Sequence, residues 1–236
     1  GTGERIWRPL TNPTRLSVNA FVDNNPRGFG LLERDRNFDH YQDDGVFYDR
    51  RPSVWVEPKA GPDGQLWGQG AVRLVEIPTA DETSDNIVAF WQPADLPQPG
   101  DERQFSYRLY WGLRAPHPSR LATVEATRTG IGGVIGKPRT YYSWRFAVDF
   151  VGGELPSLSA KAKIEPVITA SRGEVELTSA RPLAAIDGWR AMFDIKPTDD
   201  SVEPITLRLY LRADGQALSE TWLYQWTPPP PADRKF

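Results

Sequence analysis

The sequence has no cysteine, one methionine and two histidines among its 236 residues. The absence of cysteine excludes disulfides, thiolate metal sites and cysteine nucleophiles. No run of about 18 apolar residues occurs, so no membrane-spanning helix is predicted. The formal net charge of -3 provides no basic footprint, and a nucleic-acid partner is therefore not expected.

Helix-forming patterns are also scarce. The 22 prolines and 20 glycines would interrupt helix interiors repeatedly, and no amphipathic helix of useful length is found. Apolar and polar residues instead alternate with the period of two that is typical of strands. In the first half of the chain this alternation covers residues 16–23, 53–58, 70–78, 86–93 and 104–112. The sequence therefore predicts an all-β protein.

The pattern changes after residue 112. Residues 113–120, "LRAPHPSR", contain two prolines and no apolar period, which predicts a linker. The remainder, 121–236, is predicted to form an immunoglobulin-like sandwich, with a hairpin turn at Asp214–Gly215. Its strand candidates are residues 121–128, 142–150, 161–170, 173–180, 188–195, 204–212 and 217–226. Residues 1–112 have fewer strands and many polar loops, and we expect them to be part of a larger β-structure.

The stretch "RDRNFDHYQDDG" (34–45) concentrates paired charge. It does not fit a calcium loop, and a zinc site lacks ligands because the other histidine, His117, lies in the predicted linker. Two interpretations stay open. One is a solvated turn held by arginine–aspartate pairs, and the other is a sugar site in which such pairs support hydroxyl-binding groups beside aromatic rings. The candidate binding residues are Arg34, Asp35, Arg36, His40 and Tyr41.

A second acidic cluster lies in "PTADETSDNIVAFW" (78–91). Asp81, Glu82 and Asp85 precede a strand that is apolar on both faces. A solvated turn is one interpretation. The other is a carboxyl group at the lip of a sheet, where neighbouring aromatic rings would exclude water and raise its pKa.

The segment "TRTGIGGVIGKPRTYYSW" (127–144) joins two predicted strands through a glycine-rich connection longer than a hairpin needs. Long connections of this kind are either disordered or functional. Ile131, Val134 and Ile135 argue against a purely solvated loop. Residues 129–141 are therefore a candidate lid whose glycines permit movement.

Long stretches of the chain resemble a known family. They are "NPRGFGLLERDRNFDHYQDDGVFYDRRPSVWVEP", "GQGAVRLVEIPTADETSDNIVAFWQP" and "GWRAMFDIKPTDDSVEPITLRLYLRADGQALSETWLYQW". They are similar to the periplasmic glucans biosynthesis proteins of the OpgG/OpgD (MdoG/MdoD) family, with a pattern closer to the G type. The resemblance implies the C-terminal part of a large galactose-mutarotase-like β-sandwich, followed by an immunoglobulin-like sandwich. It also implies a periplasmic location and a β-glucan oligosaccharide or polysaccharide as partner. No cofactor and no metal are expected.

The resemblance further implies chemistry on osmoregulated periplasmic glucans with a β-1,2-linked glucose backbone. Some family members resemble inverting β-1,2-glucanases in which an aspartate is the general acid. The resemblance places that acid in the second acidic cluster, and Asp85 is the predicted catalytic residue because it lies nearest the strand entry. The catalytic base is expected upstream of Gly1, so this chain alone is not expected to be a complete enzyme. The alternative is a non-catalytic glucan-binding protein that organises backbone synthesis.

The remaining expectations concern the glucan cleft. Residues 34–45 would form one wall, and Trp55, Trp67 and Trp91 would stack on pyranose rings. Glu57 shares a strand face with Trp55 and is also predicted to bind substrate. The 129–141 loop is expected to reach the cleft of a partner subunit if the protein forms a homodimer.

Overall fold

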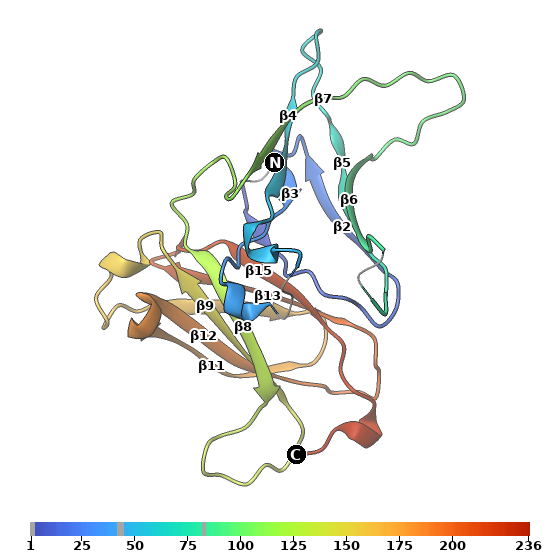
Figure 1. The fold of residues 1–236 in the computed structure, drawn as a ribbon. Coiled ribbons are helices and arrows are strands. Elements are labelled where there is room, and N and C mark those ends of the chain that lie inside the picture. The colour runs from blue at the N-terminus through green and yellow to red at the C-terminus, as the bar shows by residue number, and fades with distance from the viewer. Residues whose placement is uncertain (1–2, 42–44, 82–83) are drawn as a thin grey trace. The chain divides into compact units, whose positions relative to one another are not determined.

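The computed structural model describes residues 3–41, 45–81 and 84–236, and it confirms the predicted all-β class. In these residues the only helices are 3-10 turns, and none has the length and hydropathy needed to cross a membrane. The turns are η1 (Phe38–His40), η2 (Tyr48–Arg50), η3 (Leu155–Ser157), η4 (Ala184–Ile186) and η5 (Pro231–Asp233). The chain forms two compact units, Gly1–Gly3 with Leu10–Pro118 and Glu4–Pro9 with Ser119–Phe236 (Figure 1).

The first unit consists of two antiparallel three-stranded sheets. One has the order β2 (Ser17–Asn24), β5 (Gln69–Glu76), β6 (Ile87–Pro93), and the other β3 (Phe29–Leu31), β4 (Ser53–Lys59), β7 (Ser106–Gly112). The five segments with alternating polarity all form strands. The short strand β3 lies in a glycine-containing segment that has no such alternation.

Apolar side chains of the first unit remain largely exposed. Val22 on β2 is 85% exposed, and Trp111 on β7 is 67% exposed. Among the described residues of this unit, only Ala71 and Leu74 are buried hydrophobic residues. Period-two alternation therefore produced the strands here without a filled core.

The second unit is a two-layer sandwich. Its first sheet has the order β11 (Glu174–Leu183), β12 (Gly188–Lys196), β9 (Trp144–Val151), β8 (Thr123–Ile131). Its second sheet has the order β1 (Ile6–Trp7), β15 (Thr221–Trp226), β13 (Ile205–Ala213), β10 (Glu165–Ala170), with β14 (Gln216–Ala217) also paired to β13. All seven predicted strands of 121–236 are present, and Asp214–Gly215 turns β13 into β14 with positive φ at both residues.

The core of the second unit consists of the inward-facing residues of these strands. Phe146 and Phe193 stack with ring centroids 5.3 Å apart, and Trp222 meets Phe146 edge to face at 5.6 Å. All three side chains are 0% exposed. Burying aromatic side chains of this size is a large contribution to stability. This unit therefore has the filled core that the first unit lacks.

The division into units differs from the sequence-based one at the start of the chain. The prediction assigned residues 1–112 to the first domain. In the structure, Ile6 and Trp7 pair in parallel with Thr221 and Trp222 of β15, so residues 4–9 join the second unit. A two-residue strand carries no periodicity that could have indicated this pairing.

Candidate functional site

One face of the β3–β4–β7 sheet collects polar and aromatic side chains. The register pairs Trp55 of β4 with Tyr110 of β7, and Glu57 with Arg108. Directly paired residues of an antiparallel sheet project to the same side. These four side chains therefore share one face, here called the polar face, and the adjacent apolar residues of β4 and β7 lie on the other.

Glu57 is at the centre of the polar face. Its Oε2 accepts hydrogen bonds from the Tyr110 hydroxyl at 2.8 Å and from the Lys59 ammonium at 2.7 Å, while His117 Nε2 lies 3.3 Å from Oε1. The Lys59 hydrogen bond, followed by that of Tyr110, lowers the pKa of Glu57 to about 2. Glu57 is thus an ionised acceptor near neutral pH, and it has no proton to donate.

Tyr110 and His117 were not predicted as site residues. Their rings meet edge to face with centroids 5.9 Å apart. His117 comes from the segment that the sequence indicated as a linker, and Tyr110 comes from the strand predicted over residues 104–112, to which no binding role was assigned. The alternation in β7 contained a signal, since Arg108 and Tyr110 alternate with the apolar residues. The pairing with Glu57 required the register between two strands.

Trp55 packs closely on the backbone of Gly28. A side chain at Gly28 would collide with the indole ring, so the close approach requires glycine at that position. The Trp55 Nε1 atom is buried and has no hydrogen-bond partner among the described residues. Trp55 therefore lies beside Glu57 on the polar face, as the alternation predicted, with its indole fixed against the segment that leads into β3.

The described part of the charged stretch, residues 34–41, is held by contacts among its own side chains and with Glu33. Asp35 Oδ2 lies 2.7 Å from His40 Nδ1, and the Tyr41 hydroxyl lies 2.9 Å from Glu33 Oε1 and 2.7 Å from the Asp35 carbonyl oxygen, so that either acceptor can take its one proton. Burial, followed by the hydrogen bond to the Glu33 carboxylate, raises the pKa of Tyr41, which therefore stays protonated. Three of the predicted binding residues, Asp35, His40 and Tyr41, therefore lie together. Arg34 precedes Asp35 in the chain and is partly buried.

Among the described residues, Arg36 binds backbone carbonyls and a hydroxyl, and it does not pair with the side chain of Asp35 or Asp39. Its guanidinium donates to the carbonyl of Asp49 at 3.0 Å, and to the Ser53 hydroxyl and the Leu113 carbonyl, each at 3.5 Å. Carbonyl groups in turns have no ladder partner, and the five donors of arginine can satisfy several of them at once. Arg36 thus ties the stretch to the ends of β4 and β7. Gln42, Asp43 and Asp44 lie outside the described residues.

Trp67 and Trp91 occupy a different environment from Trp55. Trp67 is the centre of an aromatic cluster, with ring centroids 5.9 Å from Trp91, 5.4 Å from Phe105 and 6.4 Å from both Phe29 and Tyr107. Its Nε1 donates to the Ser106 carbonyl at 2.9 Å. These two tryptophans therefore pack against each other and against neighbouring rings, whereas Trp55 lies on the polar face beside Glu57.

Asp85 lies in the connection between β5 and β6. The backbone amide of Ile77 donates to the Asn86 carbonyl at 2.8 Å, which closes this turn next to Asp85. Asp81 and Asp85 are both exposed, and Phe90 is itself 44% exposed. The exclusion of water around Asp85 that the sequence suggested is not found among the described residues. Glu82, the other candidate acid, is outside them.

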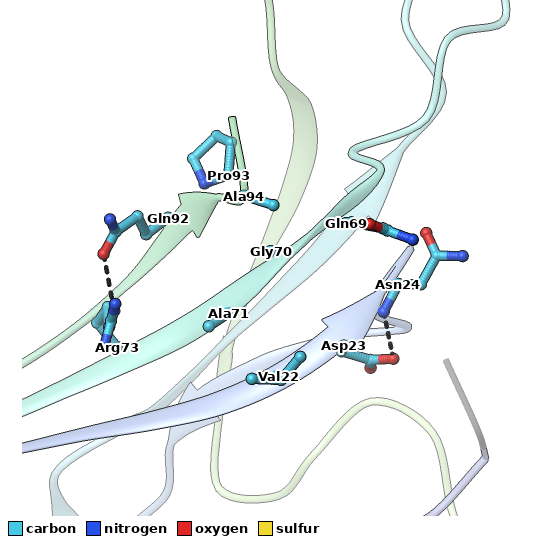
Figure 2. Close-up of a pocket in the computed structure, with 10 residues that line it drawn as sticks. All are labelled: Val22, Asp23, Asn24, Gln69, Gly70, Ala71, Arg73, Gln92, Pro93 and Ala94. Atoms are coloured by element: carbon cyan, nitrogen blue, oxygen red, sulfur yellow. Dashed lines mark hydrogen bonds between the residues drawn. The ribbon is translucent and has the colours of Figure 1, made fainter. Parts of the chain in front are cut away.

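A hollow of about 730 Å³ lies at one end of the β2–β5–β6 sheet (Figure 2). Arg73 Nε donates to Gln92 Oε1 at 2.7 Å, and the backbone amide of Asn24 donates to Asp23 Oδ1 at 2.7 Å. The lining residues are Val22, Asp23, Asn24, Gln69, Gly70, Ala71, Arg73, Gln92, Pro93 and Ala94. No sequence-predicted site residue lines the hollow. Its polar groups can form hydrogen bonds. We nevertheless favour the polar face as the candidate site, because its charged and aromatic side chains contact one another at defined distances.

Comparisons with known proteins point in one direction. The family model described as "Periplasmic glucan biosynthesis protein, MdoG" matches residues 1–226. The chain is 62% identical over 238 residues to "Glucans biosynthesis protein D" of Xanthomonas axonopodis pv. citri (strain 306), which covers 100% of this chain and 44% of the relative. It is 63% identical over 230 residues to the protein of the same name in Stenotrophomonas maltophilia (strain K279a), covering 98% and 42%. The chain thus spans less than half the length of these relatives, and the matches do not assign it to the G or the D type.

Proposed function

This chain belongs to the MdoG family of periplasmic glucan biosynthesis proteins, and we propose that it binds a β-1,2-linked glucan and contributes to its cleavage by inverting acid/base chemistry. The observation that carries the proposal is the arrangement on the polar face. Glu57 is an ionised acceptor held by Lys59 and Tyr110, and the indole of Trp55 lies beside it. A pyranose ring offers hydroxyl groups to charged partners and an apolar face to an aromatic ring.

The proposed roles are divided between two carboxylates. Glu57 has a pKa of about 2, so it accepts hydrogen bonds from sugar hydroxyls and does not protonate the leaving group. Asp85, whose side chain is exposed at the end of the β2–β5–β6 sheet, is proposed as the general acid. In an inverting mechanism the acid and base carboxyls stand about 6.5–9.5 Å apart, so that a water molecule fits between base and sugar. We expect the base outside this chain.

The candidate lid, residues 129–141, is proposed to cover the glucan; β8 extends to Ile131 and β9 begins at Trp144, so the β8–β9 loop itself comprises residues 132–143. This proposal is supported by its tip, where Val134 is 46% exposed and Ile135 is 94% exposed. Exposed apolar side chains of this kind gain free energy when another surface covers them. In a homodimer the cleft they cover would belong to the partner subunit.

The second candidate function is glucan binding without cleavage. It is favoured by the exposure of Asp85, because a general acid that acts near neutral pH is usually desolvated. Both functions use the polar face. They differ only in whether a proton donor stands at the glycosidic oxygen.

The deciding experiment is to incubate the full natural protein with linear β-1,2-glucan and separate the products by chromatography. Asp85→Asn should reduce cleavage on the order of 10²-fold or more and preserve glucan binding, since the amide cannot donate the required proton. Asp81→Asn, in the same exposed turn, is the matched control and should retain near-normal cleavage. Normal cleavage by Asp85→Asn would refute the assignment. Binding without any cleavage by the unaltered protein would establish the second function.

A further inference from the structure

Two ion pairs link the same two strands of the second unit. The register of β9 and β12 places Arg145 opposite Asp194, and Asp149 opposite Arg190. Each arginine binds its carboxylate through Nε and Nη2, with distances of 2.7 and 3.0 Å in the first pair and 2.6 and 2.9 Å in the second. The Asp194 and Asp149 side chains are 0% and 2% exposed. The two pairs are therefore closely matched in chemistry, geometry and burial.

The pairs differ in their third partner. Asp149 also accepts a hydrogen bond from Arg128 of the neighbouring strand β8. Asp194 Oδ2 instead accepts from the backbone amide of Gly133 at 2.7 Å, and Arg145 Nη2 donates to the carbonyl of the same glycine at 2.7 Å. Both backbone polar groups of one loop residue are thus bound by a buried ion pair of the sheet.

The loop sequence matches this contact. A side chain at Gly132 would collide with Ser143 Oγ and with the Asp194 carboxylate, and Gly133 has φ of +111°, so both positions favour glycine. The Gly132 amide also donates to the Ser143 carbonyl at 2.8 Å, which joins the two ends of the loop. Beyond this root the connection extends away from the sheet (Figure 1). The root is held by the sheet while the tip is free of it.

A buried carboxylate is costly unless its oxygen atoms are fully hydrogen-bonded. Detaching the loop would remove the Gly133 amide from Asp194 and leave a buried charge with one donor fewer. The ion pair therefore couples the conformation of the loop root to the folded state of the sheet. The pair formed by Asp149 and Arg190 imposes no such condition on the loop.

We propose that Arg145 and Asp194 are positioning residues for the β8–β9 loop. This role requires no contact between either side chain and the substrate. They hold the root in one conformation, so that the apolar tip at Val134 and Ile135 is presented at a constant place. The functional consequence of this positioning rests on the proposed role of the loop as a glucan lid, but the structural consequence does not.

The structural consequence is tested by amide hydrogen exchange on the 236-residue chain. The Gly133 amide should be protected at least about tenfold more than the Gly136 amide at the loop tip. Arg145→Lys keeps the charge but loses the two-pronged contact, and exchange of Gly133 should become about 10- to 100-fold faster, as expected for a weakened hydrogen bond to a charged group. Arg190→Lys is the matched control and should leave Gly133 exchange unchanged.

Equal exchange at Gly133 and Gly136 in the unaltered chain would overturn the proposal, and this comparison holds even if Arg145→Lys does not fold. An equal acceleration of Gly133 by both lysine variants would also overturn it, because the effect would then be general destabilisation of the sheet. Thermal unfolding of the two variants provides the reference for their overall stability.

The functional consequence is tested with linear β-1,2-glucan and the full natural protein. Arg145→Lys should raise KM several-fold with a smaller change in kcat, whereas Arg190→Lys should change neither. Deleting residues 131–137 separates the two proposals. If the deletion leaves glucan kinetics unchanged, the lid fails while the exchange result stands. If the deletion impairs turnover but Arg145→Lys leaves both Gly133 exchange and KM normal, the positioning role fails.

Discussion

The two units of the chain consist of strands with the same alternating pattern, yet they pack in opposite ways. In the second unit, Phe193 and Trp222 are 0% exposed between two sheets. In the first unit, Trp111 is 67% exposed on a strand of equally regular alternation. A sheet buries its apolar face only when another layer covers it. Alternation therefore predicts which face is apolar, but not whether that face is buried.

The units also differ in how they use charge. Buried carboxylates of the second unit, such as Asp149, are bound by arginines across paired strands and have a structural role. Glu57 of the first unit is 16% exposed and is held by a lysine, a tyrosine and a histidine, of which Lys59 and His117 are 41% and 53% exposed. Solvent-accessible charged groups beside an aromatic ring favour ligand binding. We therefore expect binding chemistry in the first unit, and structural pairing and loop positioning in the second.

The largest expected effect tests the packing contrast. Phe193→Ala should destabilise the second unit by roughly 3–5 kcal/mol, because it leaves a cavity beside Phe146 and Trp222. Trp111→Ala, an exposed aromatic in the first unit, should cost less than about 1 kcal/mol. Urea denaturation of each variant measures the difference. Equal losses would show that the two units are equally well packed.

A smaller effect separates the tryptophans of the first unit. Trp55→Ala should weaken glucan binding about tenfold, or ~1.4 kcal/mol, with little change in the melting temperature. Trp67→Ala should instead lower the melting temperature, because it removes the centre of an aromatic cluster. Calorimetric titration with β-1,2-glucan and thermal unfolding measure the two quantities. Loss of stability without loss of binding in Trp55→Ala would make Trp55 a packing residue.

The smallest expected effect concerns pH. The pKa of Glu57 is lowered in the folded chain from 4.5 to about 2, so its ionised form is complete above the unfolded value and is lost only as pH falls toward about 2. The unaltered protein should bind glucan more tightly than Glu57→Gln. The ratio of their two affinities should change by less than about twofold between about pH 5 and 8. It should fall only below about pH 3. A collapse of the ratio between about pH 5 and 7 would mean that Glu57 titrates there and is a candidate acid.

Local pattern was enough for most strands. The alternation of apolar and polar residues over 204–212 predicted β13. This prediction needed no knowledge of other segments, because side chains alternate in direction along any single extended segment. Asp214–Gly215 likewise predicted its turn, since both residues tolerate positive φ. The pairing of Ile6 and Trp7 with β15 could not be predicted, because two residues carry no period and their partners lie more than two hundred positions away in the chain.

The candidate site shows the same division. The sequence alone determined that Trp55 and Glu57 share a strand face, because side chains alternate along any strand. Only the tertiary structure placed Tyr110 and His117 in contact with Glu57. It also determined that Arg36 binds backbone carbonyls and that Trp55 lies apart from the aromatic cluster around Trp67. Alternation is a property of a single backbone segment. Register, layer packing and charge pairing depend on which distant segments meet, and a local period contains no information about that choice.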